Sequence, residues 1–135
     1  MVIDSSALVT ILLGESAALM VVQAIAAHDR RLLSAANLLE TSIVIEGRKG
    51  DDGARELDLL LYRSGIEIVP VDVEQAEIAR VAWRRFGKGR HPAGLNYGDC
   101  FAYALAKQTG LPLLFLGNDF RRTDIKAVLL DGTVS

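Results

Sequence analysis

Four acidic residues could act together in catalysis, because two of them follow apolar strands and the other two lie on apolar helices. If their carboxylates converge, the like charges repel, and such a cluster needs either raised pKa values or a bound cation. Oxygen ligands without histidine or cysteine suit Mg²⁺, and Mn²⁺ is a second option. Such metals polarise phosphates and activate water for in-line attack. The four candidates are Asp4, Glu40, Asp99 and Asp119.

Each carboxylate also has a purely structural explanation. Asp4 suits the N-cap of a following helix, and Asp119 suits a turn. Asp99 lies three positions after Asn96, which can itself be the N-cap, and an acid in the first turn suits the helix dipole. Glu40 shares a mainly apolar helical stripe, where Glu rarely lies without a partner unless its side chain reaches solvent.

The elements that must position these residues alternate between short apolar strands and helices. This alternation predicts an α/β fold, a three-layer α/β/α sandwich around a mostly parallel sheet of about five short strands. A chain of 135 residues has the size of one domain, so we expect a single domain over 1–135. The expected strands are 1–3, 31–34, 67–71, 113–116 and 127–130, and the expected helices are 7–13, 16–28, 35–47, 54–63, 73–86 and 97–109.

The order of these elements favours a shared site. Asp4 and Asp119 both follow strands, so a parallel sheet delivers them to the same edge, where open α/β sheets bind their ligands. Asp99 opens the helix that leads into the strand 113–116, although its side of the sheet does not follow from the sequence. The joint pattern therefore favours a metal pocket over four separate structural roles.

The overall composition limits the possible classes of function. The net charge of −2 excludes a strongly basic nucleic-acid binder, so any nucleic-acid site must be a local patch. Cys100 is the only cysteine, which excludes an intrachain disulfide and favours a reducing cytoplasm. The apolar stretch 5–27 lacks a basic start and is broken by Gly14-Glu15-Ser16, so we expect neither a signal peptide nor a membrane anchor. Half of the residues are hydrophobic, which leaves apolar surface for a partner or a second copy.

A local basic patch is available in the segment WRRFGKGRHPAG, residues 83–94. Flexible basic loops suit the phosphate backbone, although a cationic helix end also suits the helix dipole. The candidate RNA contacts are Arg84, Arg85, Lys88 and Arg90, together with Arg121 beyond the last acid.

The segments VIDSSAL, LNYGDCFAYALA and PLLFLGNDF, with Glu40 between the first two, resemble the PIN-domain nucleases. More narrowly, they are similar to the VapC-type toxins of bacterial toxin–antitoxin pairs, over nearly the whole chain. This resemblance implies a PIN-like fold and a Mg²⁺-dependent endoribonuclease, a hydrolase that a cognate VapB-like antitoxin holds inactive. It further implies a cytoplasmic enzyme that cuts tRNA or rRNA, forms a homodimer and joins a larger toxin–antitoxin assembly on DNA through the antitoxin.

The same resemblance assigns roles to residues of this chain. Asp4 and Asp99 would be the principal direct metal ligands, while Glu40 and Asp119 would complete the negative pocket. Ser6 matches a hydroxyl position near the family's site. Many relatives carry a Thr and another acid just before the last acid, whereas this chain has Asn118 there, in a supporting position.

Two alternatives of other classes compete with the nuclease. A receiver-like signalling domain would carry paired acids after the first strand and a Lys after the last one, but Asp4 is followed by Ser5-Ser6 and that Lys is missing. A magnesium phosphatase for small molecules would carry acids two positions apart after the first strand, which this chain lacks. Either alternative would gain if the protein bound Mg²⁺ but cut no RNA.

Overall fold

The central sheet has the first strand of the chain in its middle. The computed structural model of the protein describes residues 1–130 and Val134. The strands are β1 (Val2–Ile3), β2 (Leu32–Ser34), β3 (Glu67–Val69), β4 (Leu113–Leu114) and β5 (Ala127–Val128). All four neighbouring pairs are parallel, and their order is β3-β2-β1-β4-β5. The described residues thus confirm the predicted parallel sheet of short strands.

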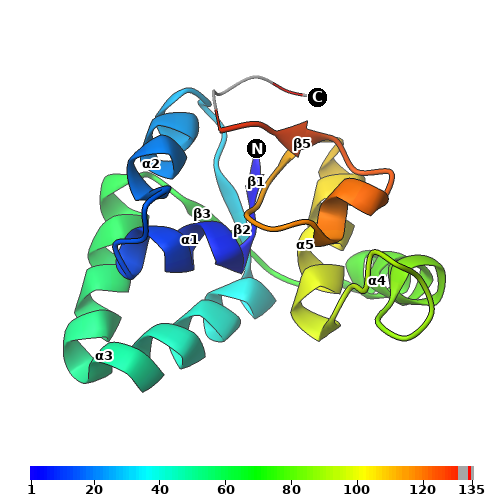
Figure 1. Cartoon of the computed structure of the whole chain (residues 1–135), viewed down its shortest axis with the longest axis horizontal. Helices are drawn as coiled ribbons and strands as arrows, with labels where there is room; N and C mark the ends of the chain where they lie inside the picture. Colours follow the sequence, from blue (N-terminus) through cyan, green and yellow to red (C-terminus); the bar gives the residue numbers. More distant parts are fainter. Residues whose placement is uncertain (131–133, 135) are drawn as a thin grey trace.

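Helices cover both faces of this sheet (Figure 1). On one face lie α1 (Ser5–Leu12), α2 (Ala18–Ala26) and α3 (Ala35–Arg63), and on the other lie α4 (Val73–Phe86) and α5 (Tyr97–Thr109). Because side chains alternate along a strand, Val2 and Leu113 pack toward α4 and α5, whereas Ile3 and Leu114 pack toward α1 to α3. The predicted three-layer sandwich is confirmed.

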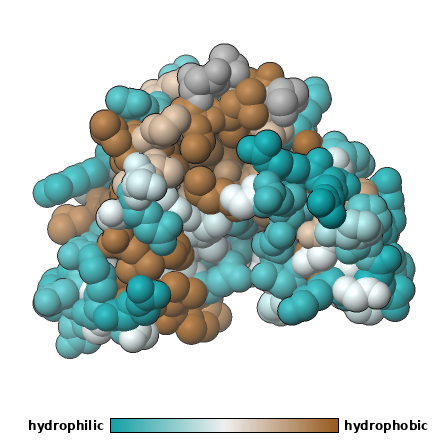
Figure 2. All heavy atoms as spheres, viewed as in Figure 1, coloured by the Kyte–Doolittle hydropathy of each residue, from teal (hydrophilic) through white to brown (hydrophobic). Residues whose placement is uncertain are grey.

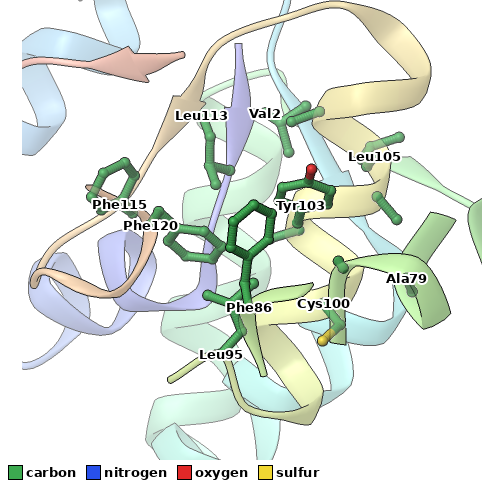
Figure 3. Packing of buried hydrophobic residues seen from close by; sticks show 14 of the residues in the cluster. Val2, Ala79, Phe86, Leu95, Cys100, Tyr103, Leu105, Leu113, Phe115 and Phe120 are labelled. Atoms are coloured by element: carbon green, nitrogen blue, oxygen red, sulfur yellow. The ribbon is translucent and has the colours of Figure 1, made fainter. Parts of the chain in front are cut away.

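The core between the sheet and α5 is rich in aromatic rings (Figure 3). Phe86 and Tyr103 pack with ring centroids 5.9 Å apart, and Phe115 and Phe120 with centroids 5.1 Å apart. Every residue of α5 from Ala102 to Ala106 is buried, which explains why that segment carries no charge. The buried helix is a rigid mount for Asp99 in its first turn.

Several element boundaries differ from those that the sequence predicts. The helices expected at 35–47 and 54–63 are both present within α3, which is broken at Gly50, where φ is 60° and ψ is −145°, but they extend almost to that residue and leave no longer turn between them. The last two strands are shorter than expected, and the turn after β4 becomes the short 3₁₀ helix η1 (Asp119–Arg122). Residues 131–133 and Ser135 of the predicted single domain lie outside the described residues. No helix within the described part of the chain is long and apolar enough to cross a bilayer.

Candidate active site

The candidate site lies at the carboxyl edge of the sheet, where the strand order reverses. The chain leaves β1 and continues outward through β2 and β3, and it later returns to the other side of β1 as β4. Open α/β sheets bind ligands at such a switch point. The space-filling view is hollowed at the bottom between the two helical layers, where Figure 1 draws the first turns of α3 and α5 (Figure 2).

Asp4 leaves the end of β1 and caps α1. One of its oxygens, Oδ2, accepts hydrogen bonds from the Ser6 backbone N–H at 3.0 Å and from Ser6 Oγ at 2.6 Å. Ser6 Oγ in turn accepts from the Leu116 N–H at 3.0 Å, which ties Asp4 to the loop after β4. The other oxygen, Oδ1, is buried and has no hydrogen-bond partner among the described residues. Only one of the two carboxylate oxygens of Asp4 therefore takes part in capping.

Asp99 is also both a capping residue and a buried carboxylate. It forms a capping box with Asn96: Asp99 N–H donates to Asn96 Oδ1 at 2.9 Å, and Asn96 N–H donates to Asp99 Oδ2 at 3.1 Å. Helix α5 runs antiparallel to β4, so its N-terminus lies at the carboxyl edge, which the sequence could not settle. Asp99 is only 8% exposed, a low value for an aspartate that carries just one such bond on its side chain.

Glu40 points from α3 toward the first turn of α5. Its Oε1 accepts from Ser5 Oγ at 2.5 Å and from Asn37 Nδ2 at 3.2 Å, and Asn37 Nδ2 also donates to the Gly98 carbonyl at 3.0 Å. A Cβ on Gly98 would overlap with the Glu40 carboxylate, so only glycine allows this approach. Ser5, Asn37 and Gly98 thus position Glu40. The motif DSSAL and the dipeptide Gly98-Asp99 already contained two of them, but only the fold shows which carboxylate they serve.

Asp119 is the most exposed of the predicted acids. It opens η1 directly after Asn118, and both side chains face solvent at the same edge. Asp119 is near enough to act on Asp99, because its negative charge contributes to raising the pKa of Asp99. The structure therefore brings all four predicted acids to one region, with Asp119 at its rim.

The electrostatics of this acidic pocket, formed by Asp4, Glu40, Asp99 and Asp119, are unfavourable without a cation. Burial, with a smaller effect of the Glu40 charge, raises the pKa of Asp4 to about 6. Burial also raises the pKa of Asp99 to about 7, with added repulsion from Asp4, Asp119 and Glu40. Two hydrogen-bonded caps would ordinarily have lowered pKa values, so burial, with a smaller effect of charge repulsion, outweighs the capping hydrogen bonds.

This donor set fits a hard divalent cation. The unpartnered Asp4 Oδ1 and the raised pKa values are what a carboxylate pair shows when its counter-charge is a metal ion. Within residues 1–130 and Val134, no three acidic, histidine or cysteine side chains are grouped tightly enough to hold a metal ion by themselves. Mg²⁺ keeps several water ligands and often uses only one or two carboxylates, so the loose grouping suits Mg²⁺ better than a closed protein cage.

The predicted basic residues divide into two groups. Arg85 lies 3.6 Å from Asp124, and the Arg90 guanidinium stacks 4.1 Å from the Trp83 ring centroid, so both have intramolecular contacts. Arg84, Lys88 and Arg121 are exposed and form no ion pair within the described residues. Hydrophilic surface covers α4 and the loop after it in Figure 2.

Comparisons with known proteins agree with this geometry. The PIN domain family model matches residues 1–126. A "Ribonuclease VapC" of Mycolicibacterium smegmatis is 59% identical over 128 residues, which cover 95% of this chain and 99% of the relative. "Ribonuclease VapC30" of Mycobacterium tuberculosis is 55% identical over 130 residues, with 96% and 99% coverage.

A solved structure shares the fold at much lower identity. It is described as Mycobacterium tuberculosis VapC20, a "Sarcin-Ricin loop cleaving toxin", and it superposes with a TM-score of 0.76 at 15% identity, covering 92% of this chain and 95% of that one. The family match favours the nuclease over the receiver-like and phosphatase alternatives. The chain belongs to the PIN-domain family and, within it, to the VapC ribonucleases, the endoribonuclease toxins of toxin–antitoxin pairs.

Proposed function

We propose that this endoribonuclease cuts RNA phosphodiester bonds at the acidic pocket, and that Asp4 and Asp99 hold a Mg²⁺ ion there, which Mn²⁺ can replace. A bound ion of this kind polarises a phosphate and lowers the pKa of a bound water. The observation that carries the proposal is the pair of buried carboxylates at the switch point, both with raised pKa values and one with an unpartnered oxygen.

The chain's own residues supply the orientation. Ser6 donates two hydrogen bonds to Asp4 Oδ2 and so leaves the buried Oδ1 free to bind a cation. Asn96 fixes Asp99 in the same way from the first turn of α5. Glu40, held by Ser5 and Asn37, accepts a proton or orients a water on the α3 side. Burial of Asp4 and Asp99 keeps the local dielectric constant low, which strengthens each of these interactions.

The test incubates the purified protein with total RNA, first with Mg²⁺ and then with EDTA. We expect discrete fragments with 5′-phosphate and 3′-hydroxyl ends that disappear with EDTA. Asp99→Asn should lower the cleavage rate by at least about a hundredfold, because Asn keeps the cap but loses the charge. The matched control is Asp58→Asn, which changes an exposed aspartate of α3. An Asp99→Asn protein that cuts at the wild-type rate would falsify the assignment.

We also propose that a cognate VapB-like antitoxin covers the exposed apolar side chains of α2 and α3. The toxin would form a homodimer, and the antitoxin would link that dimer to DNA. The support is the amount of apolar surface on these two helices, which a monomer would not leave in water. Its largest exposed members are Leu19, Met20, Val22, Leu39, Ile43, Leu59 and Tyr62. We further propose a tRNA or rRNA target in the cytoplasm. Co-purification with the product of the neighbouring reading frame tests the antitoxin.

A further inference from the structure

A second concave surface lies beside the acidic pocket, on the other flank of α5. It is an apolar groove of about 610 Å³ between α4 and α5, within the range of about 300–1,000 Å³ for small-ligand sites. We call it the aromatic groove. It is lined by two alanines of α4 and Cys100, together with the larger side chains of Arg80, Trp83, Arg84, Tyr97 and Phe101.

Two of the aromatic side chains of the groove are exposed, and each contacts a neighbouring side chain. Trp83 is 44% exposed, yet Arg90 stacks over its ring and the Gly87 backbone approaches its edge so closely that a Cβ there would overlap with it. Tyr97 is 82% exposed and packs edge-on against Phe101, with ring centroids 4.9 Å apart at 80°. When a flat ligand stacks on a ring that a neighbouring side chain already restrains, the ring loses little further conformational entropy.

Positive charge flanks these rings. Arg80 and Arg84 lie on the α4 side of the aromatic groove. Arg80 pairs with the exposed Glu77 at 3.0 Å, a weak surface contact that a stronger anion can displace. Arg84 forms no ion pair within the part of the chain that the structure describes. A flat apolar surface flanked by guanidinium groups matches a nucleobase with its neighbouring phosphates.

The aromatic groove and the acidic pocket are joined through one helical turn. Tyr97, Cys100 and Phe101 line the groove, and Asp99 lies between them on the opposite flank of the same turn. The width of a helix with its side chains is about 10 Å, so a single strand bound across the turn spans both sites with only a few nucleotides. A helix of a partner protein is a less suitable occupant of the aromatic groove, because α2 and α3 expose more apolar side chains for such a helix to cover.

We propose that the aromatic groove binds a nucleobase of the RNA substrate, close to the phosphate that lies at the acidic pocket. The base stacks on Trp83 or Tyr97, and Arg84 contacts a flanking phosphate. This inference rests on the proposed function and makes the groove a determinant of where the RNA is cut. Such stacking is tolerant of sequence, so it would favour an unpaired nucleotide over a particular base.

The experiment uses Trp83 as its own probe, because it is the only tryptophan of the chain. The full-length protein in EDTA, where no cleavage is expected, is titrated with a short single-stranded RNA and with an abasic oligomer of the same length and charge. We expect saturable quenching of Trp83 fluorescence by the RNA and about tenfold weaker binding of the abasic oligomer. Tyr97→Ala should weaken RNA binding about tenfold without changing abasic binding, whereas the control Val73→Ala, 79% exposed at the start of α4 and outside the groove, should change neither.

Two results would overturn the proposal. One is equal affinity and equal quenching for the RNA and the abasic oligomer. The other is a Tyr97→Ala protein with unchanged RNA affinity and an altered sedimentation profile, which would make the groove a protein interface. A cleavage assay on the same samples separates the two proposals. If the wild-type protein binds bases but cuts no RNA, only the proposed function is rejected. If it cuts RNA without base-dependent binding, only the proposal that the groove binds a base is rejected.

Discussion

Asp99 is a residue with two roles that oppose each other. As part of a capping box it stabilises α5, and as a buried carboxylate near Asp4 it destabilises the folded protein whenever both are charged. The sequence predicted both roles for Asp99 but could not weigh them, because the balance depends on burial. It also could not identify Ser5, Asn37 and Gly98 as the residues that position Glu40, since they join α1, α3 and α5 across more than thirty positions of the chain.

The first residue-scale prediction concerns pH. Asp4 and Asp99 have pKa values raised to about 6 and about 7, so the folded state binds their protons more tightly than the unfolded state does. Their contribution to stability is full below about pH 4 and is lost as pH rises through 6 and 7. Metal-free protein should therefore unfold more easily in urea at pH 8 than at pH 5.5.

Asp99→Asn should remove most of this pH dependence and stabilise the metal-free protein at pH 8 by about 1–3 kcal/mol. The lowered pKa values of Asp72 and Asp124 act only below about pH 4, so they do not obscure the comparison. Equal urea midpoints for wild type and Asp99→Asn at pH 8 in EDTA would show that the charge of Asp99 does not destabilise the folded protein.

A second residue-scale prediction concerns Gly98. In Gly98→Ala the new Cβ displaces the Glu40 carboxylate from Ser5 and Asn37. Because the displaced group is the end of a flexible side chain, the thermal midpoint should change little, whereas cleavage should fall by about 10- to 100-fold. Gly47→Ala is the control, since a Cβ there meets nothing within 4 Å. Normal cleavage by Gly98→Ala would mean that the position of Glu40 is unimportant.

At the scale of elements, the sequence predicted the break in α3 but not its length. Its two apolar stripes predicted two helices, and the turn-forming residues 50–53 predicted a break between them. The structure has two helical stretches that meet at Gly50, and this single non-helical residue makes the turn while 51–53 are already helical. All five strands were predicted at their positions along the chain, although not their order in the sheet, and the last two are shorter than their apolar runs. A run of residues can be apolar because it is buried, but it forms a strand only where a neighbouring strand pairs with its backbone. The apolar runs are therefore longer than the strands.

The kink yields an element-scale prediction. Gly50 has φ 60° and ψ −145°, a region that residues with a Cβ rarely occupy. Gly50→Ala should therefore lower the free energy of unfolding by about 1–3 kcal/mol. Gly47→Ala, one turn earlier in regular helix, should raise it by about 0.5–1 kcal/mol. Urea unfolding of the two variants checks both signs, and a stable Gly50→Ala protein would mean that the two halves of α3 can realign.

At the scale of the whole molecule, a cation should hold the two helical layers together. Asp4 and Glu40 come from the α1 and α3 layer, and Asp99 comes from the α5 layer. Mg²⁺ should therefore raise the thermal midpoint, with a gain of about 2.7 kcal/mol at a hundredfold excess over its dissociation constant. Asp4→Asn keeps the helix cap but should abolish this gain, whereas Asp58→Asn should keep it. The same Mg²⁺ shift in Asp4→Asn would place the ion elsewhere.

The central position of β1 has a consequence for synthesis of the toxin. Val2 pairs with Leu113, and the charge of Asp4 acts on Asp99, so the middle of the sheet and the acidic pocket both join segments from opposite halves of the chain. A growing chain that has displayed Asp4 still lacks its partner carboxylate and the neighbouring strand. The acidic pocket therefore cannot form on a growing chain until α5 and β4 have been synthesised, and an antitoxin already present would meet a pocket that has only just formed.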